Sequence, residues 1–109
     1  MQVVYISGAY RGNKKPDTIY ENIYKARLVA KKYWARGYAV ICPHLNTAFM
    51  DGACEDNTWL DGDLELLNRS DIIVMLPEWE QSEGAALEHK EAMILGKSII
   101  YEKENGNCS

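Results

Sequence analysis

The sequence predicts an α/β fold in three layers, with a parallel β-sheet between two layers of helices. Short apolar runs rich in Val and Ile alternate along the chain with longer stretches of helical periodicity. This alternation is typical of strand–helix–strand units. The first apolar run, residues 3–6, is apolar at consecutive positions, which indicates a central strand buried on both faces. Right-handed crossovers between such strands place helices on both faces of the sheet.

The first half of the chain predicts two strands and one long helix. A turn over residues 7–12 follows the first strand. Proline, Asp and Thr then begin a helix over residues 16–36, which Gly37 ends. A second strand covers residues 38–42. The inner face of the helix is expected to carry Ile23, Ala26, Ala30 and either Tyr33 or Trp34.

The second half predicts two further strand–helix pairs. Its expected elements are a loop over 44–55, a helix over 56–69, a strand over 71–76, a loop over 77–81, a helix from Ser82 to near Gly96 and a strand over 98–101. Leu60, Leu64 and Leu67 mark the buried stripe of the first of these helices. We expect residues 1–101 to form a single domain, and residues 102–109 to be a polar tail that frays.

Composition narrows the classes of function. The chain has 109 residues and a formal net charge of −4, without a dominant basic patch. We therefore expect neither a nucleic-acid polymer nor a membrane as partner. The three cysteines contain no CxxC pair, which favours reduced thiols over a disulfide or metal framework. No apolar stretch is long enough to span a bilayer. We expect a cytoplasmic protein that holds no metal.

A seven-residue stretch, Ser-Glu-Gly-Ala-Ala-Leu-Glu at 82–88, organises the candidate chemistry. Ser82 is a good N-cap, and Gly84 leaves backbone N–H groups open to an anion at the helix N-terminus. Glu88 falls between Ala85 and Ala92 on a stripe of small residues that should face inward. A carboxylate there is exposed through a cleft or costly to bury. We interpret Glu88 as a nucleophile beside an anion seat.

A second carboxylate lies on an apolar stripe. Asp63 is three residues after Leu60 and four before Leu67. Glycosyl transfer with retention uses two carboxylates roughly 5 Å apart, one of which attacks the anomeric carbon. The alternative is that each carboxylate caps a backbone group or pairs with Arg11 or Arg27.

Other candidates lie near the carboxyl ends of the expected strands, where ligands bind in such sheets. The Tyr5 hydroxyl is a possible partner of Glu88, although periodicity alone favours a core tyrosine. The turn with Gly8, Arg11 and Gly12 could contact phosphate or sugar, and His44 a substrate. Trp79 is open to base stacking, to rim packing or to a subunit contact. The chain has neither a P-loop nor GxGxxG, so no nucleoside triphosphate or dinucleotide is indicated.

These residues resemble the nucleoside 2-deoxyribosyltransferase superfamily, in particular its short branch, the 2′-deoxynucleoside 5′-phosphate N-hydrolases. They also resemble a related group of small, uncharacterised bacterial and phage proteins. The likeness covers most of the chain in four stretches that occur in the family's order. These are residues 4–12 (Val-Tyr-Ile-Ser-Gly-Ala-Tyr-Arg-Gly), His44, Asp63-Leu64 with Leu67 and residues 70–74, and Ser82, Gly84 and Glu88 in the spacing Ser-x-Gly-x-x-x-Glu.

The resemblance implies a flavodoxin- or Rossmann-like sheet of four or five strands, no cofactor, and a homodimer or higher homo-oligomer. It implies that Glu88 attacks C1′ of the sugar, that Tyr5 orients Glu88, and that Asp63 contacts a sugar hydroxyl or helps to protonate the leaving base. The implied substrate contacts are Gly8, Tyr10, Arg11, Gly12, His44, Ser82 and Gly84. Transferases of this superfamily tend to have an acidic residue at the position of Ser82. A serine favours a 5′-phosphate there, because a hydroxyl can donate to phosphate whereas a carboxylate repels it.

The resemblance leaves alternatives open. The first expectation is cleavage of the N-glycosidic bond of a (2′-deoxy)nucleoside 5′-monophosphate. The alternatives are base exchange on free nucleosides and a non-catalytic module that binds a nucleotide, with a flavodoxin-like FMN carrier more distant. The chain departs from the family in the loop 45–57, in its four strands where longer relatives have five, and in a tail without the counterpart of the residue that a neighbouring subunit contributes.

Overall fold

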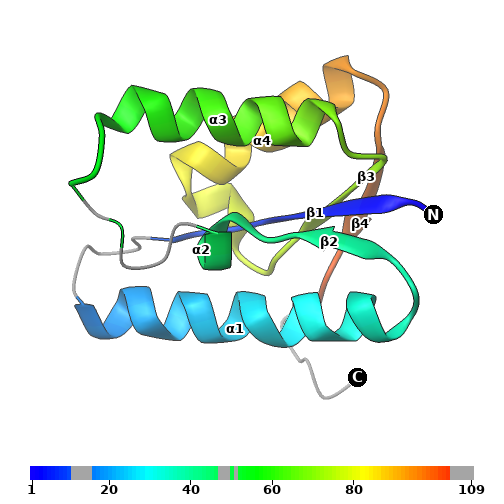
Figure 1. Cartoon of the computed structure of the whole chain (residues 1–109), viewed down its shortest axis with the longest axis horizontal. Helices are drawn as coiled ribbons and strands as arrows, with labels where there is room; N and C mark the ends of the chain where they lie inside the picture. The colour runs from blue at the N-terminus through cyan, green and yellow to red at the C-terminus, as the bar shows by residue number, and fades with distance from the viewer. Residues whose placement is uncertain (11–15, 47–49, 51, 104–109) are drawn as a thin grey trace.

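The structure is a computed structural model that describes residues 1–10, 16–46, 50 and 52–103. Its elements alternate along the chain as the sequence predicts (Figure 1). They are β1 (Val3–Ser7), α1 (Pro16–Ala35), β2 (Ala39–Ile41), α2 (Pro43–Asn46), α3 (Asp56–Asn68), β3 (Ile72–Met75), the 3-10 turn η1 (Trp79–Gln81), α4 (Glu83–Ile94) and β4 (Ser98–Tyr101). Within the described part of the chain, no helix has the length and apolar character needed to cross a membrane.

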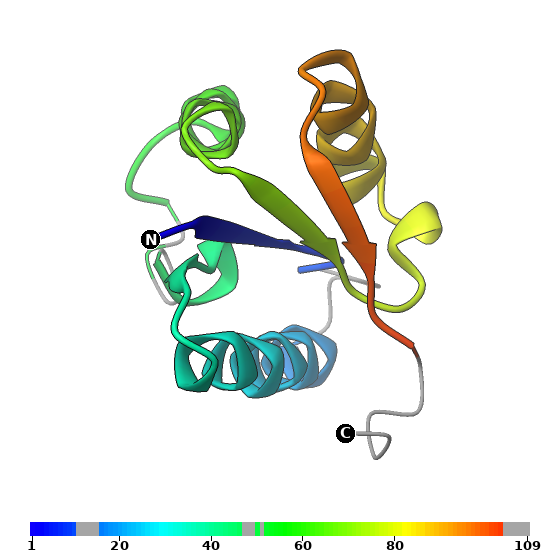
Figure 2. The ribbon, with the colours of Figure 1, turned by 90° about the vertical axis from the view of Figure 1, so that its right-hand side faces the viewer.

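The four strands form one parallel sheet in the order β2-β1-β3-β4. Figure 2 shows α1 on one side of the sheet and α3 and α4 on the other. The predicted three-layer α/β fold with helices on both faces is therefore confirmed. β1 is central because the chain returns past it, from β2 at one edge to β3 on the other side. Ligands of such sheets bind beyond the carboxyl ends of the strands at this reversal.

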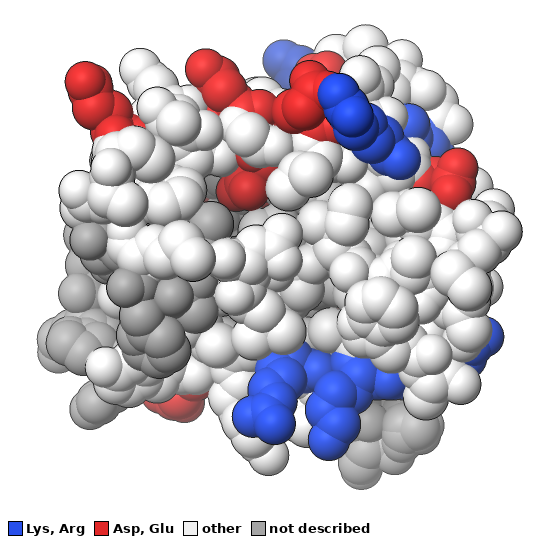
Figure 3. All heavy atoms as spheres, viewed as in Figure 1, with Lys and Arg blue, Asp and Glu red and all other residues white. Residues whose placement is uncertain are grey.

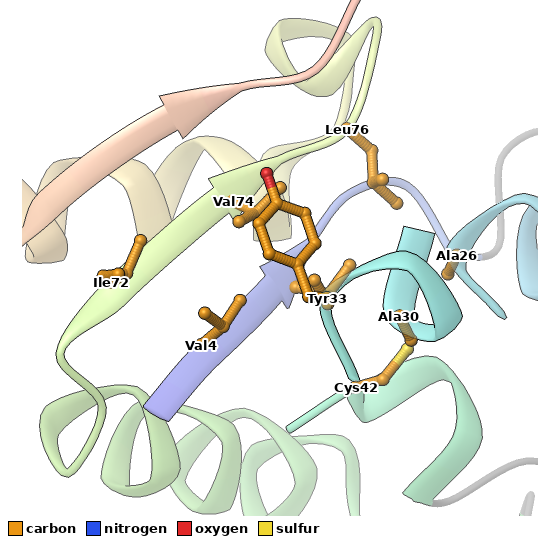
Figure 4. Close-up of a cluster of buried hydrophobic side chains, with 9 residues drawn as sticks. Val4, Ala26, Ala30, Tyr33, Cys42, Ile72, Val74 and Leu76 are labelled. Carbon is orange, nitrogen blue, oxygen red and sulfur yellow. The ribbon is translucent and has the colours of Figure 1, made fainter. Parts of the chain in front are cut away.

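Alternate side chains of the central strands enter two separate cores. On the α1 side, Val4 and Ile6 of β1 pack with Ala26, Ala30 and Tyr33 (Figure 4). The remaining buried members of this cluster are Cys42, Ile72, Val74 and Leu76. Three residues of the expected inner face of α1, Ala26, Ala30 and Tyr33, are thus buried, whereas Ile23 is half-buried and Trp34 is 56% exposed. Of the two aromatic candidates, only Tyr33 reaches the core.

The core on the other side of the sheet determines what faces α4. It contains Tyr5, Leu67, Ile73, Met75, Ala85 and Ala92. The two alanines of α4 allow the helix to lie close to the sheet, and Glu88 lies between them in sequence on the same buried face. A strand alternates its side chains, so Tyr5 and Ser7 point from β1 toward this helix. The sequence therefore buries a carboxylate against two hydroxyl groups.

Two expectations about irregular segments are wrong. Residues 44–46 of the expected loop over 44–55 belong instead to the short helix α2, in which Leu45 and Asn46 donate backbone hydrogen bonds to Cys42 O. A proline at the first position has the φ angle that a helix start requires. Glu102 does not fray: its carboxylate accepts from Lys32 Nζ at 2.6 Å and from the Tyr33 hydroxyl at 2.8 Å. These two bonds anchor the chain after β4.

Charge is unevenly distributed over the surface. Figure 3 shows basic side chains at the centre of the lower edge, over α1, and acidic side chains along the upper edge, over α3, with basic ones beside them toward the right. In the sequence, α1 carries four basic residues, Lys25, Arg27, Lys31 and Lys32, and Arg36 follows its end, whereas α3 has acidic residues and no basic one. The two edges therefore offer different surroundings to a charged ligand.

Candidate active site

Both oxygens of the Glu88 carboxylate are held by hydroxyl groups of β1. Tyr5 donates to Oε2 at 2.7 Å, and Ser7 donates to Oε1 at 2.6 Å. These distances are typical of hydroxyl–carboxylate hydrogen bonds. Glu88 is 8% exposed, and it lines a cavity of about 1100 Å³ at the carboxyl edge of the sheet. The site thus presents a carboxylate that is oriented and almost buried, yet open to a ligand.

Burial shifts the protonation of this site. Loss of water around Glu88 raises its pKa from 4.5 to about 7, against the opposing effect of the hydrogen bonds from Ser7 and Tyr5. The negative charge of Asp63 raises the pKa of Glu88 further. Burial, followed by the charge of Glu88, also raises the pKa of Tyr5, so the phenol stays protonated and remains a donor. Glu88 therefore exchanges its proton near neutral pH.

Asp63 faces the same cavity from α3. Burial raises the pKa of Asp63 from 3.8 to about 6. The two carboxylates line one cavity and interact electrostatically, so they do not lie at opposite ends of the sheet. Two other acidic residues of α3, Asp61 and Glu65, are exposed, and Glu65 pairs with Arg69 at 2.7 Å. Two titratable groups with shifted pKa values in one cleft are a feature of catalytic sites.

The N-terminus of α4 opens into the cavity. The Ser82 side chain accepts a hydrogen bond from Ala85 N at 3.2 Å, as predicted for an N-cap. Its hydroxyl proton is not used by this bond and can be donated to an anion. Apart from the adjoining residues and the backbone of α4 itself, no atom of the described residues lies within 4 Å of the place where a Cβ on Gly84 would be, so the backbone there is uncovered. Ser82 and Gly84 both line the cavity.

The turn after β1 forms the opposite wall. A Cβ on Gly8 would lie 2.6 Å from Leu76 Cδ1, so only glycine allows the ends of β1 and β3 to approach this closely. Asn22 of α1 donates to Tyr10 O at 3.0 Å and holds the turn. Gly8 and Tyr10 line the cavity with the catalytic candidates, whereas Arg11 and Gly12 lie outside the described residues.

His44 enters the cavity wall from α2. Its Nε2 donates to Ala9 O at 2.8 Å, and its ring meets that of Tyr10 edge-on. Burial lowers the pKa of His44, which keeps the ring neutral. Nδ1 is then an acceptor, and it is buried without a hydrogen-bond partner among the described residues. Such an orphaned acceptor is costly unless a ligand donates to it.

Sequence reasoning missed two residues of the site. Ser7 is two positions after Tyr5, so strand alternation places both on the face that meets Glu88. Trp59 lines the cavity and lies four residues before Asp63 on α3, a spacing that places both on one helix face. Trp79, considered for base stacking, instead stacks on His89 at 4.1 Å and does not line the cavity.

The described part of the chain offers no group of three or more His, Cys, Asp or Glu side chains that could hold a metal ion. The site itself brings together two carboxylates whose pKa values burial raises to about 6 and about 7, hydroxyl donors, a neutral imidazole and the exposed N-terminus of a helix.

Comparison with known proteins supports the fold. The model of a family described as a domain of unknown function, DUF4406, matches residues 2–101. No curated protein matches the chain in sequence. A solved 2-deoxyribosyltransferase from Bacillus psychrosaccharolyticus superposes with a TM-score of 0.65 at 19% identity, over 91% of this chain and 70% of that one. A 2-desoxiribosyltransferase from Leishmania mexicana gives 0.64 at 20% identity, over 93% of this chain and 63% of that one.

Proposed function

The chain belongs to the DUF4406 family, and we propose that it cleaves the N-glycosidic bond of a (2′-deoxy)nucleoside 5′-monophosphate through a covalent glycosyl–Glu88 intermediate. The observation that carries this proposal is the carboxylate of Glu88, held by Tyr5 and Ser7 at the wall of a cavity. The fold shared with two 2-deoxyribosyltransferases supports the same chemistry.

The first step forms the glycosyl ester. A Glu88 oxygen attacks C1′ of the sugar, and the C1′–N bond breaks with its electron pair moving to the base nitrogen. Tyr5 and Ser7 fix the carboxylate so that little reorientation is needed. Asp63, with a pKa of about 6, supplies the proton to the leaving base or accepts a hydrogen bond from a sugar hydroxyl. Two carboxylates in these roles suit retaining glycosyl transfer.

The second step releases the sugar. Water attacks C1′, the bond from C1′ to Glu88 breaks, and the carboxylate returns with a proton passed to solvent. When a second base replaces water, the same intermediate gives base exchange, which is the alternative function. The choice of a monophosphate follows from Ser82, whose free hydroxyl proton and neighbouring backbone at Gly84 favour an anion.

The remaining wall of the cavity would recognise sugar and base. The Nδ1 atom of His44 can accept a hydrogen bond from a substrate hydroxyl or amino group, which would satisfy its missing bond. Gly8 and Tyr10 lie beside it, and we place Arg11 and Gly12 in the same substrate-binding turn on the sequence resemblance alone. Trp59 offers an aromatic surface to the base.

We also propose that the chain acts as a homodimer or higher homo-oligomer. Three neighbouring apolar side chains at the end of α4 support this: Met93, Ile94 and Leu95 are 61%, 69% and 39% exposed. Contact with a second copy of the chain would remove these apolar side chains from water. Light scattering on the purified protein measures its mass, and a monomer at all concentrations would contradict the proposal.

Base release tests the enzymatic proposal. A panel of nucleosides and 5′-monophosphates is incubated with the wild type and with Glu88→Ala, and the free base is measured by chromatography. We expect release from monophosphates that the variant loses. Exchange that requires an added free base would favour the transferase, and nucleotide binding without turnover, unchanged in Glu88→Ala, would favour a non-catalytic module.

A further inference from the structure

The cavity extends beyond the space around Glu88, along one stripe of α1. The helix lines it with Thr18, Asn22, Lys25, Leu28, Val29 and Lys32. Because an α-helix rises 1.5 Å per residue, the ends of this stripe are about 21 Å apart. The cavity volume of about 1100 Å³ also exceeds the range of about 300–1,000 Å³ that is usual for small-molecule pockets. A nucleoside monophosphate between Glu88 and Ser82 leaves the α1 part of the cavity unfilled.

The part along α1 is continuous with the proposed phosphate seat. Pro77 and Gln81, on the segment that leads to Ser82, line the same cavity. Glu102 N donates to Met75 O at 2.9 Å, so the residues after β4 lie beside the end of β3, where Pro77 begins its loop. Ser82, the α1 stripe and Lys103 therefore line one continuous cavity.

This part of the cavity is rich in lysine. It is lined by Lys25, Lys32 and Lys103, with Glu102 as the acidic residue among them. Lys32 is engaged by Glu102 at 2.6 Å. Among the described residues, no carboxylate is within ion-pair distance of Lys25 or Lys103. The carboxylates that line the cavity elsewhere are Asp63 and Glu88 near the sugar site, and Glu78 and Glu83, which are exposed near Ser82.

We propose that this cationic arm, defined by Lys25 and Lys103, binds a second phosphate, so that nucleoside 5′-diphosphates bind more tightly than monophosphates. The inference rests on the proposed function, because the α-phosphate must sit at Ser82 for the β-phosphate to reach the arm. The ion pair of Lys32 with Glu102, supported by the Tyr33 hydroxyl, positions the segment that carries Lys103. Ammonium groups bind phosphate as point charges.

A binding measurement tests this inference independently of base release. Calorimetry on a Glu88→Gln protein compares a deoxynucleoside monophosphate with the diphosphate of the same base. A charged hydrogen bond to the second phosphate predicts binding that is about tenfold tighter for the diphosphate. The double substitution Lys25→Gln and Lys103→Gln should abolish this preference. Lys31→Gln is the matched control, since Lys31 is exposed on the same helix and does not line the cavity.

Two results would overturn the inference: equal affinity for both nucleotides, or a preference that persists in the double variant. Inorganic diphosphate that binds as tightly as the nucleotide would also overturn it, because the arm would then be a site for a free anion. Added salt provides a second measurement, and the preference should shrink as ionic strength rises. Absence of base release from every substrate would refute the proposed function. The calorimetric preference for the diphosphate tests the cationic arm separately, because it requires no turnover.

Discussion

The hydroxyl of Tyr5 lies 2.7 Å from Oε2 of Glu88, although the two residues are 83 positions apart in the sequence. The parallel sheet brings them together, because β1 is central and α4 packs over it. Ser7, on the same face of β1, binds the other oxygen at 2.6 Å. A strand and a helix, rather than a loop, therefore set the direction of the proposed nucleophile, as a preorganised site requires.

Removal of the Tyr5 hydroxyl should change the pH dependence of base release. Glu88 must lose its proton to attack, so kcat/KM is expected to rise with pH through about 7. The hydrogen bond from Tyr5 favours the ionised carboxylate. Tyr5→Phe should therefore move this rise to higher pH, whereas Asp63→Asn removes a negative charge and should move it to lower pH. Profiles that shift in the same direction in both variants would contradict the assignment.

Neutralisation of Glu88 should stabilise the fold at alkaline pH. The pKa of Glu88 is about 7 in the folded protein, above its ordinary 4.5, so the folded state retains a proton that the unfolded chain releases. The stability from this group is complete below pH 4.5 and is lost as pH rises through about 7. Glu88→Gln should gain roughly 1–3 kcal/mol over the wild type at pH 8 and little at pH 4.5.

Urea unfolding at the two pH values measures this difference. Glu21→Gln is the control, because Glu21 is an exposed residue of α1. A Glu88→Gln protein that is less stable than the wild type at pH 8 would show that the buried, ionised carboxylate does not lower the free energy of unfolding.

Replacing each of two glycines by alanine should distinguish a glycine needed for folding from one needed for binding. Gly8→Ala places a methyl group 2.7 Å from Leu76 Cβ, and this overpacking should cost about 1–3 kcal/mol. Gly84→Ala has open space around the new methyl and lies inside α4, where alanine is favoured by up to about 1 kcal/mol. Thermal melts should show a loss for the first and no loss for the second. Base release from a monophosphate should nevertheless fall in Gly84→Ala, and full activity there would argue against the anion seat.

Substitutions of Ser82 should reveal whether a phosphate binds beside it. Asp is as good an N-cap as Ser, so Ser82→Asp should preserve α4 and place a carboxylate in the cavity. We expect kcat/KM for monophosphates to fall by at least tenfold and that for free nucleosides to be maintained. Ser82→Ala removes the cap and should cost about 1 kcal/mol of stability. Equal losses for both substrate classes in Ser82→Asp would contradict a phosphate at this position.

Most of the scaffold could be predicted from the sequence, because its signals are local. Alternating apolar runs specify the strands, and the spacing of Ala85, Glu88 and Ala92 indicates which face of α4 is buried. Tyr5 was less certain, since a buried tyrosine in a strand can pair with many groups. Its partner became evident only when the crossover placed α4 over β1.

The residues that were missed depend on contacts between distant segments. Glu102 looks like the start of a polar tail, and only the position of α1 beneath the end of β4 provides Lys32 and Tyr33 as its partners. Helix α2 is too short to show periodicity. Ser7 could have been identified by alternation from Tyr5, but only once the facing helix was known.

The mass of the protein during turnover tests most directly whether Glu88 forms a covalent intermediate. The wild type is incubated with a 2′-fluoro-2′-deoxynucleoside 5′-monophosphate, whose fluorine slows hydrolysis of the ester, and is then denatured in acid and digested. We expect a peptide that contains Glu88 and carries one fluorodeoxyribosyl phosphate, and no such adduct in Glu88→Gln. Base release with no adduct on any residue, or an adduct on Asp63 in place of Glu88, would contradict this expectation.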